Sequence, residues 1–293
     1  MSKPKIIVTG ANGQLGKEVR VLAATYTAFD FLFVSKEDLP IHHFEMVRNY
    51  FEAAKPAFCI NCAAYTIVDK AQNEKDLALL INAESVGVLA AVCKMYNTKF
   101  IHISTDYVFD GNASAPYKES DSTSPVNFYG ATKLKGEALC LENNPDAIVI
   151  RTSWVYSEFG NNFVKTMMRL MREKENLNVV SDQVGSPTYA ADLANAILKI
   201  AQSSQLKTDS WKPGIYHYSN EGVISWYDFA VAIKELTGSK CTVNAIPTTA
   251  YPTPAKRPAW SVFDKEKIKS TYKIDIPHWK DSLILCIARL NKL

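Results

Sequence analysis

Short apolar runs alternate with amphipathic stretches through the first half of the chain. Buried strands are predicted at residues 5–9, 29–34, 58–61, 99–104 and 147–152. Between them, apolar positions recur with helical spacing at residues 14–24, 43–54, 76–96 and 128–142. Because parallel strands are joined by crossover helices, this alternation predicts an α/β fold with a Rossmann-like, doubly wound parallel sheet.

The pattern becomes less regular after Trp154. Helices are predicted at residues 162–173 and 190–201, a polar loop at 202–213, and a further helix that begins at a Ser225-x-x-Asp228 capping box. Residues 248–258 contain three prolines and cannot form a regular helix. We therefore expect a dinucleotide-binding domain at residues 1–155, with a return segment near 180–201. Residues 156–293 would mainly form a smaller α+β substrate-binding lobe.

The composition is that of a folded protein, and its net charge does not indicate binding to a highly charged partner. The 293 residues are 47% hydrophobic and 22% charged, which excludes a disordered or fibrous chain. A net charge of +3 gives no reason to expect nucleic acid or an anionic membrane as a partner. The sequence shows neither a signal peptide nor a membrane span, so we expect a cytoplasmic protein whose partner is a small molecule.

The six cysteines include one C-x-x-C spacing, Cys59 to Cys62. This spacing is that of half a zinc or redox site, but no second such pair and no nearby pair of histidines accompanies it. We therefore expect thiols that pack at a strand end in a reducing compartment, and no metal.

A glycine-rich loop follows the first predicted strand directly. Gly10, Gly13 and Gly16 form a G-x-x-G-x-x-G pattern that opens a helix, with Gln14 and Leu15 inside the pattern. Glycines allow a pyrophosphate to approach the backbone, and a helix N-terminus offers free N–H groups to phosphate oxygens. The loop therefore predicts a dinucleotide cofactor.

The end of the second predicted strand bears on which dinucleotide is bound. Ser35 and Lys36 lie where an NAD-binding protein tends to place a carboxylate on the ribose. A hydroxyl and an ammonium group suit a 2′-phosphate instead, so we expect NADPH. Glu37 and Asp38 follow closely, and NADH stays an alternative.

A third pattern points to proton transfer. Tyr129 and Lys133 form a Y-x-x-x-K motif, whose spacing places both side chains on one face of a helix. A nearby ammonium favours the phenolate and moves a tyrosine toward acid–base work near neutral pH. Thr105, at the end of the predicted strand 99–104, could hold the reacting oxygen. These three residues are the predicted catalytic set.

With these motifs, the sequence resembles the extended short-chain dehydrogenase/reductase superfamily and, within it, the dTDP-4-dehydrorhamnose reductase family. The resemblance rests on GANGQLG (10–16), NCAAYTIVDKAQ (61–72), ISTDYVFDG (103–111), SPVNFYGATKLKGE (124–137), RTSWVY (151–156), GNNFVKTM (160–167), DQVGSPT (182–188) and YPTPAKRP (251–258). The last four segments extend into the expected substrate lobe, so they bear on the substrate as well as on the fold.

The resemblance implies roles residue by residue. It makes Tyr129 the general acid, Lys133 its partner that also holds the nicotinamide ribose, and Thr105 the third catalytic member. It places Gly13, Gln14 and Leu15 at the pyrophosphate and Ala64, Tyr65 and Thr66 beside the cofactor. Asp106 and Trp154 match positions that contact the sugar nucleotide, and Arg257 lies on the proline-rich loop that would help to anchor the diphosphate. From the residues alone, Asp106 could equally be a turn residue and Trp154 an aromatic of the core or the lobe interface.

The activity implied in this way is the NADPH-dependent reduction of the 4-keto group of dTDP-4-dehydro-6-deoxy-L-mannose to dTDP-L-rhamnose. Some family members dimerise through a metal held by carboxylates, one of them just after a Pro-Thr pair. Here Pro187-Thr188 is followed by no acid until Asp192, so we expect no such metal and either a monomer or a homodimer.

Two other functions stay open at this point. A nucleotide-sugar 4,6-dehydratase or epimerase of the same superfamily is one, although dehydratases carry an Asp-Glu pair where this chain reads Asp106-Tyr107. The other is a non-catalytic regulatory subunit, because the β-subunit of methionine adenosyltransferase resembles the same reductases. The complete RTSWVY and YPTPAKRP segments favour an enzyme.

Overall fold

A six-stranded parallel sheet forms the centre of the larger part of the molecule. The computed structural model describes residues 3–292. Its sheet has the order β10-β5-β4-β3-β1-β2. The strands are β1 (Lys5–Thr9), β2 (Asp30–Val34), β3 (Phe58–Asn61), β4 (Lys99–Thr105), β5 (Ile148–Thr152) and β10 (Gly214–Tyr218). The chain reverses its direction of winding between β1 and β3, where open sheets of this kind bind ligands.

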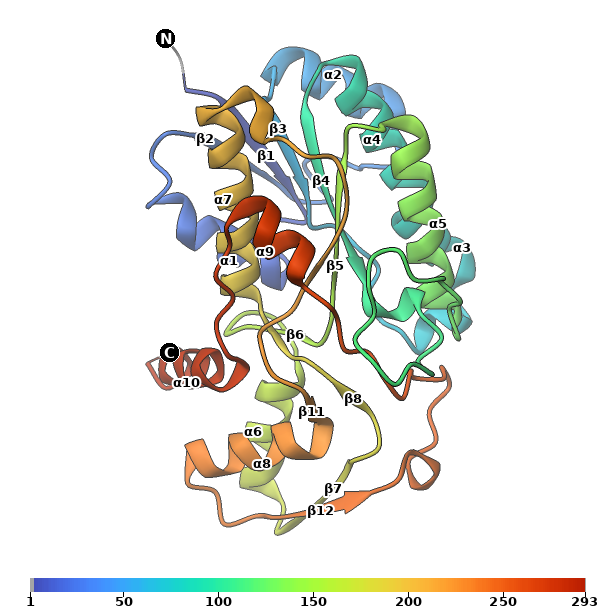
Figure 1. The fold of residues 1–293 in the computed structure, drawn as a ribbon, viewed down its shortest axis with the longest axis vertical. Helices are drawn as coiled ribbons and strands as arrows, with labels where there is room; N and C mark the ends of the chain where they lie inside the picture. Colours follow the sequence, from blue (N-terminus) through green and yellow to red (C-terminus); the bar gives the residue numbers. More distant parts are fainter. Residues whose placement is uncertain (1–2, 293) are drawn as a thin grey trace.

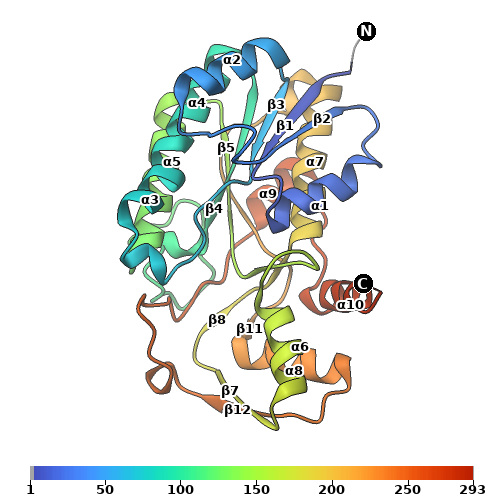
Figure 2. The ribbon, with the colours of Figure 1, turned by 180° about the vertical axis from the view of Figure 1, so that it is seen from behind.

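Helices cover both faces of the sheet (Figures 1 and 2). One face carries α1 (Gln14–Ala23), α7 (Ala190–Leu206) and α9 (Glu266–Tyr272), and the other carries α2 (Phe44–Ala54), α4 (Ser85–Met95) and α5 (Phe128–Asn143). Successive residues of β1 show the division, because Ile6 and Val8 pack toward α1 and α7 whereas Ile7 packs toward α2 and α4. The predicted doubly wound α/β fold is confirmed.

The helix expected at residues 76–96 is continuous but not uniform. It consists of α3 (Lys75–Leu79), a π-helical turn (Leu80–Glu84) and α4. By length and composition it could cross a membrane, with a mean hydropathy of 1.7, but 56% of that window is buried within the fold. It packs against α2 and α5, as the core helix of a domain does.

A second, smaller group of elements lies below the sheet in Figure 1. It contains α6 (Phe163–Glu173), α8 (Trp226–Thr237), α10 (Trp279–Leu290) and the parallel pair β7 (Asn176–Val180) and β12 (Thr242–Ile246). Short strands connect it to the sheet: β6 (Val155–Tyr156), β8 (Val184–Gly185), β9 (Thr188–Tyr189) and β11 (Ile224–Ser225). Its own apolar core gathers around Phe229 and Ile233 of α8.

The predicted elements of the first half agree with the structure to within about one residue at most ends. The Ser225–Asp228 capping box is also present. The polar loop expected at 202–213 is wrong in its first part, because α7 continues to Leu206. The strand β10 and the helices α9 and α10 were not foreseen. The short segment Gly-Ile-Tyr-His-Tyr is recognised as strand β10 only from its pairing with β5.

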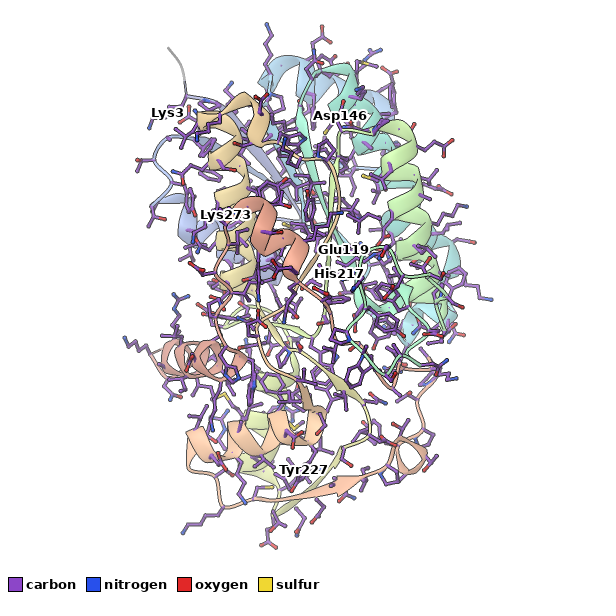
Figure 3. All side chains as sticks on the ribbon, viewed as in Figure 1. Lys3, Glu119, Asp146, His217, Tyr227 and Lys273 are labelled. Carbon is purple, nitrogen blue, oxygen red and sulfur yellow. The ribbon has the colours of Figure 1, made fainter. Side chains whose placement is uncertain are left out.

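The outer side of the edge strand β10 is covered by a loop. The backbone N–H of His217 points away from β5 and donates to Glu119, with 3.0 Å between the nitrogen and Oε1 (Figure 3). The ring of His217 faces the Tyr117 carbonyl at 3.1 Å, and it stacks on Phe263. This loop supplies a hydrogen-bond partner to the open edge of the sheet and covers that edge.

Candidate functional site

The glycine loop brings the first strand and the neighbouring strand β3 into close backbone contact. Gly10 has a φ of +64°, and a Cβ there would lie 2.5 Å from the backbone nitrogen of Ala63. A Cβ on Gly16 would lie 2.5 Å from the carbonyl oxygen of Gly10. The loop therefore closes only with glycine at these two positions, and it leaves the N-terminus of α1 open above it.

A pocket of about 500 Å³ lies at this loop, along the carboxyl ends of β1, β2 and β3. Six of the predicted cofactor residues line it: Gly10, Gly13, Ser35, Lys36, Ala64 and Tyr65. Its other lining residues were not predicted: Thr9, Asn12, Glu37, Leu39, Ile41, Cys62, Ala63, Leu77 and Ile81. The volume is in the range of ordinary ligand sites, and the added apolar residues would suit a flat base.

Six predicted cofactor residues do not line this pocket. Two of them, Tyr129 and Lys133, were also predicted as catalytic residues and lie at the end of β4. The other four lie around the glycine loop. Leu15 lies on the buried face of α1 in the apolar core, and Gly16 provides the close contact described above. The Oε1 of Gln14 accepts from Asn162 at 2.9 Å, which joins α1 to the start of α6. Thr66 is exposed. Three of these four therefore shape the surroundings of the loop rather than the pocket wall.

The rim of the pocket at the end of β2 carries the Lys36 cation and the Glu37 carboxylate, beside Ser35. The hydroxyl of Ser35 accepts from the backbone nitrogens of Glu37 and Asp38, and the Ser35 backbone N–H donates to Asp38. The Lys36 side chain is 90% exposed, and its amine lies 3.7 Å from the Glu37 carboxylate. An exposed pair of this kind is weak, so the Lys36 amine is available to an anion at the rim.

The three predicted catalytic residues come together at the end of β4. Thr105 ends this strand, and Tyr129 and Lys133 lie on the first two turns of α5, which begins at the Asn127 cap. The phenol ring of Tyr129 packs edge-on against Tyr107, and its cluster includes Tyr65 from the wall of the cofactor pocket. Lys133 donates from Nζ to the carbonyl oxygen of Ile103 at 2.6 Å. All three side chains are almost fully buried.

Burial changes the acid–base properties of this set. Contrary to the lowering expected from Lys133, it raises the pKa of the Tyr129 phenol, while the Thr105 hydroxyl acts in the opposite direction. Burial also lowers the pKa of Lys133 to about 8, against the opposing effect of Glu137. A lysine that titrates near neutral pH can exchange a proton there. The arrangement is thus suited to moving a proton at the end of β4.

Asp106 and Trp154 lie on the side of this site that faces the smaller group of elements. Burial raises the pKa of the Asp106 carboxyl to about 7, and its Oδ2 finds no partner among the described residues. Trp154 has a φ of +48°, which is unusual for a bulky residue, and its indole stacks on Trp226 with 3.6 Å between ring centroids. A backbone held in this conformation by a stacking partner gives the indole one orientation.

Arg257 is held by an acidic partner from the other part of the molecule. Its two terminal nitrogens lie 2.5 and 2.7 Å from the two carboxylate oxygens of Asp69. Asp69 follows β3, whereas Arg257 belongs to the proline-rich loop, so the pair joins the two sides of the site. The sequence singled out Arg257 but not its partner.

Several other buried groups at the site were missed by the sequence analysis. Asn82, in the π-helical turn, binds both the N–H and the carbonyl of Tyr65, at 2.8 and 3.0 Å. Asn61 and His102 contact each other at 3.0 Å beneath Lys133. The signal for His102 was a lone imidazole within an apolar strand run. Nothing local marked Asn82, because only the π turn aims it at the loop after β3.

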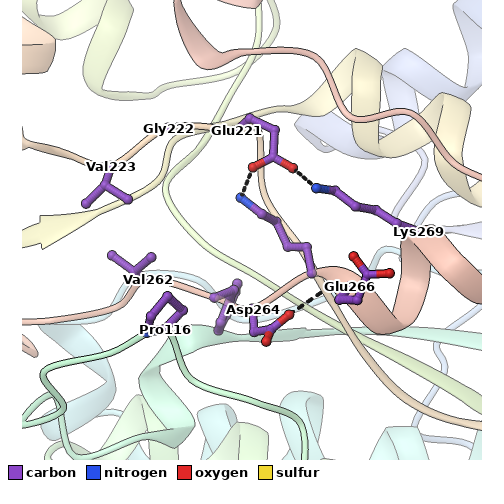
Figure 4. A pocket seen from close by; sticks show the side chains of 10 residues that line it. Pro116, Glu221, Gly222, Val223, Val262, Asp264, Glu266 and Lys269 are labelled. Carbon is purple, nitrogen blue, oxygen red and sulfur yellow. Dashed lines mark hydrogen bonds and ion pairs between the residues drawn. The ribbon is translucent and has the colours of Figure 1, made fainter.

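A further pocket, of about 270 Å³, lies away from these residues near α9 (Figure 4). Lys265 and Lys269 both pair with the carboxylate of Glu221, and Lys265 also donates to the Asn220 carbonyl. The two cations are thus engaged within the protein. This cluster joins α9 to the loop after β10 and stabilises the fold rather than offering charge to a ligand.

The structure also bears on metals and thiols. Within residues 3–292, no group of three or more His, Cys, Asp or Glu side chains is arranged to hold a metal ion. All six cysteines are free thiols, and Cys59 lies within β3, buried among apolar residues. Cys62, the second residue of the C-x-x-C pair, lines the pocket at the glycine loop.

Comparisons with known proteins agree with this geometry. Residues 4–292 match the family model described as the RmlD substrate binding domain. The dTDP-4-dehydrorhamnose reductase of Aggregatibacter actinomycetemcomitans is 42% identical over 285 residues, covering 95% of this chain and 97% of the relative.

Solved structures are similarly close. The crystal structure of a dTDP-4-dehydrorhamnose reductase from Clostridium acetobutylicum has a TM-score of 0.92 at 41% identity, covering 98% and 99% of the two chains. That of the Bacillus anthracis enzyme, in complex with NADP, has a TM-score of 0.92 at 38% identity, covering 98% of this chain and all of the other. On this extent of similarity, the chain belongs to the dTDP-4-dehydrorhamnose reductase family of Rossmann-like extended short-chain dehydrogenases/reductases.

Proposed function

We propose that this protein reduces the 4-keto group of dTDP-4-dehydro-6-deoxy-L-mannose with NADPH and releases dTDP-L-rhamnose. The observation that carries this proposal is the convergence of Thr105, Tyr129 and Lys133 at the end of β4, next to the pocket at the glycine loop. Membership of the reductase family supplies the substrate. The reaction is an oxidoreduction of a nucleotide sugar.

The pocket at the glycine loop fits a dinucleotide. Its floor is the loop that a Cβ at Gly10 or Gly16 would block, so backbone can approach a pyrophosphate closely. Free N–H groups at the start of α1 face the same space. Lys36 at the rim favours a 2′-phosphate, in keeping with the NADP bound by the similar Bacillus anthracis enzyme. NADH would bind more weakly for want of that contact.

Proton transfer falls to the chain's own residues. NADPH, when bound, supplies the hydride that the sugar C4 receives. As that carbon is reduced, negative charge develops on the carbonyl oxygen, and Tyr129 donates its phenolic proton to it. Thr105 orients the same oxygen through its hydroxyl. Lys133 stabilises the phenolate that remains and restores its proton.

The sugar nucleotide would lie between this set and the smaller group of elements. We assign Asp106 and Trp154 to the sugar, because the first has a free carboxylate oxygen and the second a fixed indole face at this site. Arg257 would serve the diphosphate from the position in which Asp69 holds it. Residues 1–155 would form the cofactor domain with a return segment near 180–201 and with β10 and α9, and the rest of 156–293 mainly the substrate lobe.

We further propose that the protein works in the cytoplasm as a monomer or homodimer. The mostly buried apolar helix through α3 and α4 supports a role inside the domain rather than in a membrane. Size-exclusion chromatography with light scattering would measure the oligomeric state.

The decisive experiment is turnover by the purified chain. The ketosugar is generated enzymatically, mixed with NADPH, and the loss of reduced cofactor is followed beside an NADH control. Deuterium carried on NADPH should appear at C4 of the sugar, and the product should coincide with dTDP-L-rhamnose in chromatography. Purified protein that carries a full complement of bound NAD and consumes no NADPH would point to a dehydratase or epimerase instead.

A further inference from the structure

A row of polar side chains crosses the neighbouring strands β1, β3 and β4 beneath Lys133. Thr9 pairs with Asn61 and Asn61 with His102 in the registers of β1, β3 and β4. The three side chains therefore lie side by side on one face, and Lys133 of α5 lies over the last of them. Each of the four is at most 2% exposed. Buried polar groups in such a row are costly unless they are paired, so their pairing is informative.

The orientation of the Asn61 amide is set by its neighbours. Its Oδ1 accepts from the backbone N–H of Ala63 at 3.2 Å and from the Thr9 hydroxyl at 2.6 Å. The backbone group can only donate, so the oxygen must face that side. The amide nitrogen then faces His102 Nδ1, at 3.0 Å. Since the amide nitrogen is a donor, His102 Nδ1 must be an acceptor.

An imidazole with Nδ1 as acceptor carries its proton on Nε2. Burial, with a smaller effect of Lys133, holds the pKa of His102 well below its ordinary value, so the ring is neutral and has one N–H. That N–H points at Lys133, with 3.4 Å between Nε2 and Nζ. A lysine ammonium has only donors, so a facing N–H opposes it, whereas the neutral amine can accept.

We propose that His102 is a positioning residue for Lys133: the row from Thr9 and Asn61 turns the Nε2–H of its ring toward the Lys133 nitrogen and thereby makes the Lys133 ammonium readier to give up a proton. The inference deepens the proposed function and rests on the role assigned there to Lys133. When Tyr129 has given its proton to the sugar oxygen, the Lys133 ammonium returns one to the phenolate, and the resulting amine takes another from water.

The other charged groups around Lys133 act in the opposite direction. Glu137 lies one turn further along α5, and its carboxylate is bound by Arg151 in a buried pair, with Nη2 2.7 Å from Oε2. Glu137 and, to a smaller extent, Cys140 favour the ammonium form, yet the pKa of Lys133 is lowered to about 8 by burial. Two groups of β4 face the Lys133 nitrogen. The Ile103 carbonyl accepts from it at 2.6 Å and favours the ammonium, whereas the N–H of His102 adds to the effect of burial.

The tautomer can be observed without substrate. In protein labelled with ¹⁵N-histidine, His102 should show a protonated Nε2 and an unprotonated Nδ1, and should stay neutral at pH 5. Loss of these signals in His102→Gln assigns them among the five histidines. A protonated Nδ1 in the wild-type protein would overturn the proposal, and this result does not depend on which sugar is reduced.

Two variants are designed to place an acceptor, instead of the Nε2–H of His102, opposite Lys133. In Asn61→Asp a second carboxylate oxygen replaces the amide nitrogen, so His102 must donate from Nδ1 and offer Nε2 as an acceptor to Lys133. In His102→Gln the ring N–H that faces Lys133 is lost without adding charge, and the amide oxygen can accept from both Asn61 and Lys133. Activity that needs the protonated lysine falls as the pH rises through its pKa. We expect this basic limb of the kcat profile to move up by about one pH unit in both variants.

A matched control separates this effect from loss of stability. Thr98→Val removes a buried hydrogen bond to the Pro56 carbonyl at the opposite end of β4. It should lower the melting temperature and leave the basic limb in place. An unmoved limb in folded Asn61→Asp and His102→Gln, with the tautomer as predicted, would show that the row does not act on Lys133. Absence of ketosugar turnover in the wild type would instead refute the proposed function and leave the tautomer result standing.

Discussion

The carboxylate of Asp69 receives both terminal nitrogens of Arg257, at 2.5 and 2.7 Å, and so joins the loop after β3 to the proline-rich loop across the site. The hydrogen bonds from Arg257 hold the pKa of the Asp69 carboxyl below its ordinary value. The backbone N–H of Ala255 also donates to Asp69, so the loop is tied at two points. Bidentate pairs of this kind fix geometry as well as charge.

Breaking this pair should weaken substrate binding. Asp69→Asn and Arg257→Lys are each expected to raise the KM for the ketosugar about fivefold, with a smaller change in kcat, since a half-exposed bidentate pair is worth about 1 kcal/mol. The double variant should be no worse than either single one, because both remove the same contact. A lower KM in Asp69→Asn would mean instead that Asp69 competes with the substrate for Arg257.

Removal of the cation at the cofactor rim should affect one cofactor only. Lys36→Ala is expected to raise the KM for NADPH about tenfold and to leave that for NADH unchanged, because only the former carries a 2′-phosphate. Lys240→Ala, at an exposed position of the smaller group of elements, serves as the control. Steady-state kinetics with both cofactors measure the ratio. Equal losses with NADPH and NADH would contradict a role in recognising the phosphate.

Asp106 makes the stability of the protein depend on pH. Its pKa is raised by burial to about 7 in the folded protein, above its unfolded value of 3.8. The protonated carboxyl is therefore favoured by folding, and this stabilisation, complete below the unfolded pKa, is lost as the pH rises through 7. Asp106→Asn should increase the free energy of unfolding at pH 8 by about 2 kcal/mol more than at pH 5.

Chemical denaturation at the two pH values measures this difference. The exposed Asp275→Asn variant should show none of it. An equal increase in the free energy of unfolding at pH 5 and pH 8 in Asp106→Asn would show that the pKa of the Asp106 carboxyl is not raised. Activity should fall in Asp106→Asn if the carboxylate contacts the sugar, so kinetics and stability report on separate roles of one residue.

The close approach of α5 to the π-helical turn depends on Gly136. A Cβ there would overlap the carbonyl oxygen of Asn82, the residue that holds the loop of Tyr65. Gly136→Ala should destabilise the protein by about 2 kcal/mol and raise the KM for NADPH. Gly87→Ala is the matched control, because its Cβ would meet side-chain atoms and no backbone, with Leu139 at 3.3 Å and Asn143 at 3.5 Å. Equal melting temperatures for the two variants would contradict this account of the helix contact.

The sequence predicted the sheet and the catalytic set because both depend on local patterns. The strand 99–104 and the Tyr129–Lys133 spacing are each visible within a few residues, and the register of parallel strands then brings Thr105 to the same edge. The contacts across the site were not predictable in this way. Asp69 has no local feature that marks it as the partner of Arg257, which lies 188 residues further along the chain.

The row beneath Lys133 shows the same limit. Thr9, Asn61 and His102 come from three strands, and each alone is consistent with a satisfied core residue. Only the registers of β1, β3 and β4 place them together. The extension of α7 to Leu206 has a related cause, since its last turns are polar in sequence yet Ser204 is buried beside Lys99 of β4.

The measurement that tests the central assignment most directly compares the wild type with Tyr129→Phe in NADPH oxidation by the dTDP-linked ketosugar. The wild type should consume NADPH in step with dTDP-L-rhamnose formation. Tyr129→Phe removes only the phenolic proton donor, so it should keep its fold and its affinity for NADPH but lose at least about a hundredfold in kcat. A Phe variant that oxidises NADPH with the ketosugar as fast as the wild type would contradict the account.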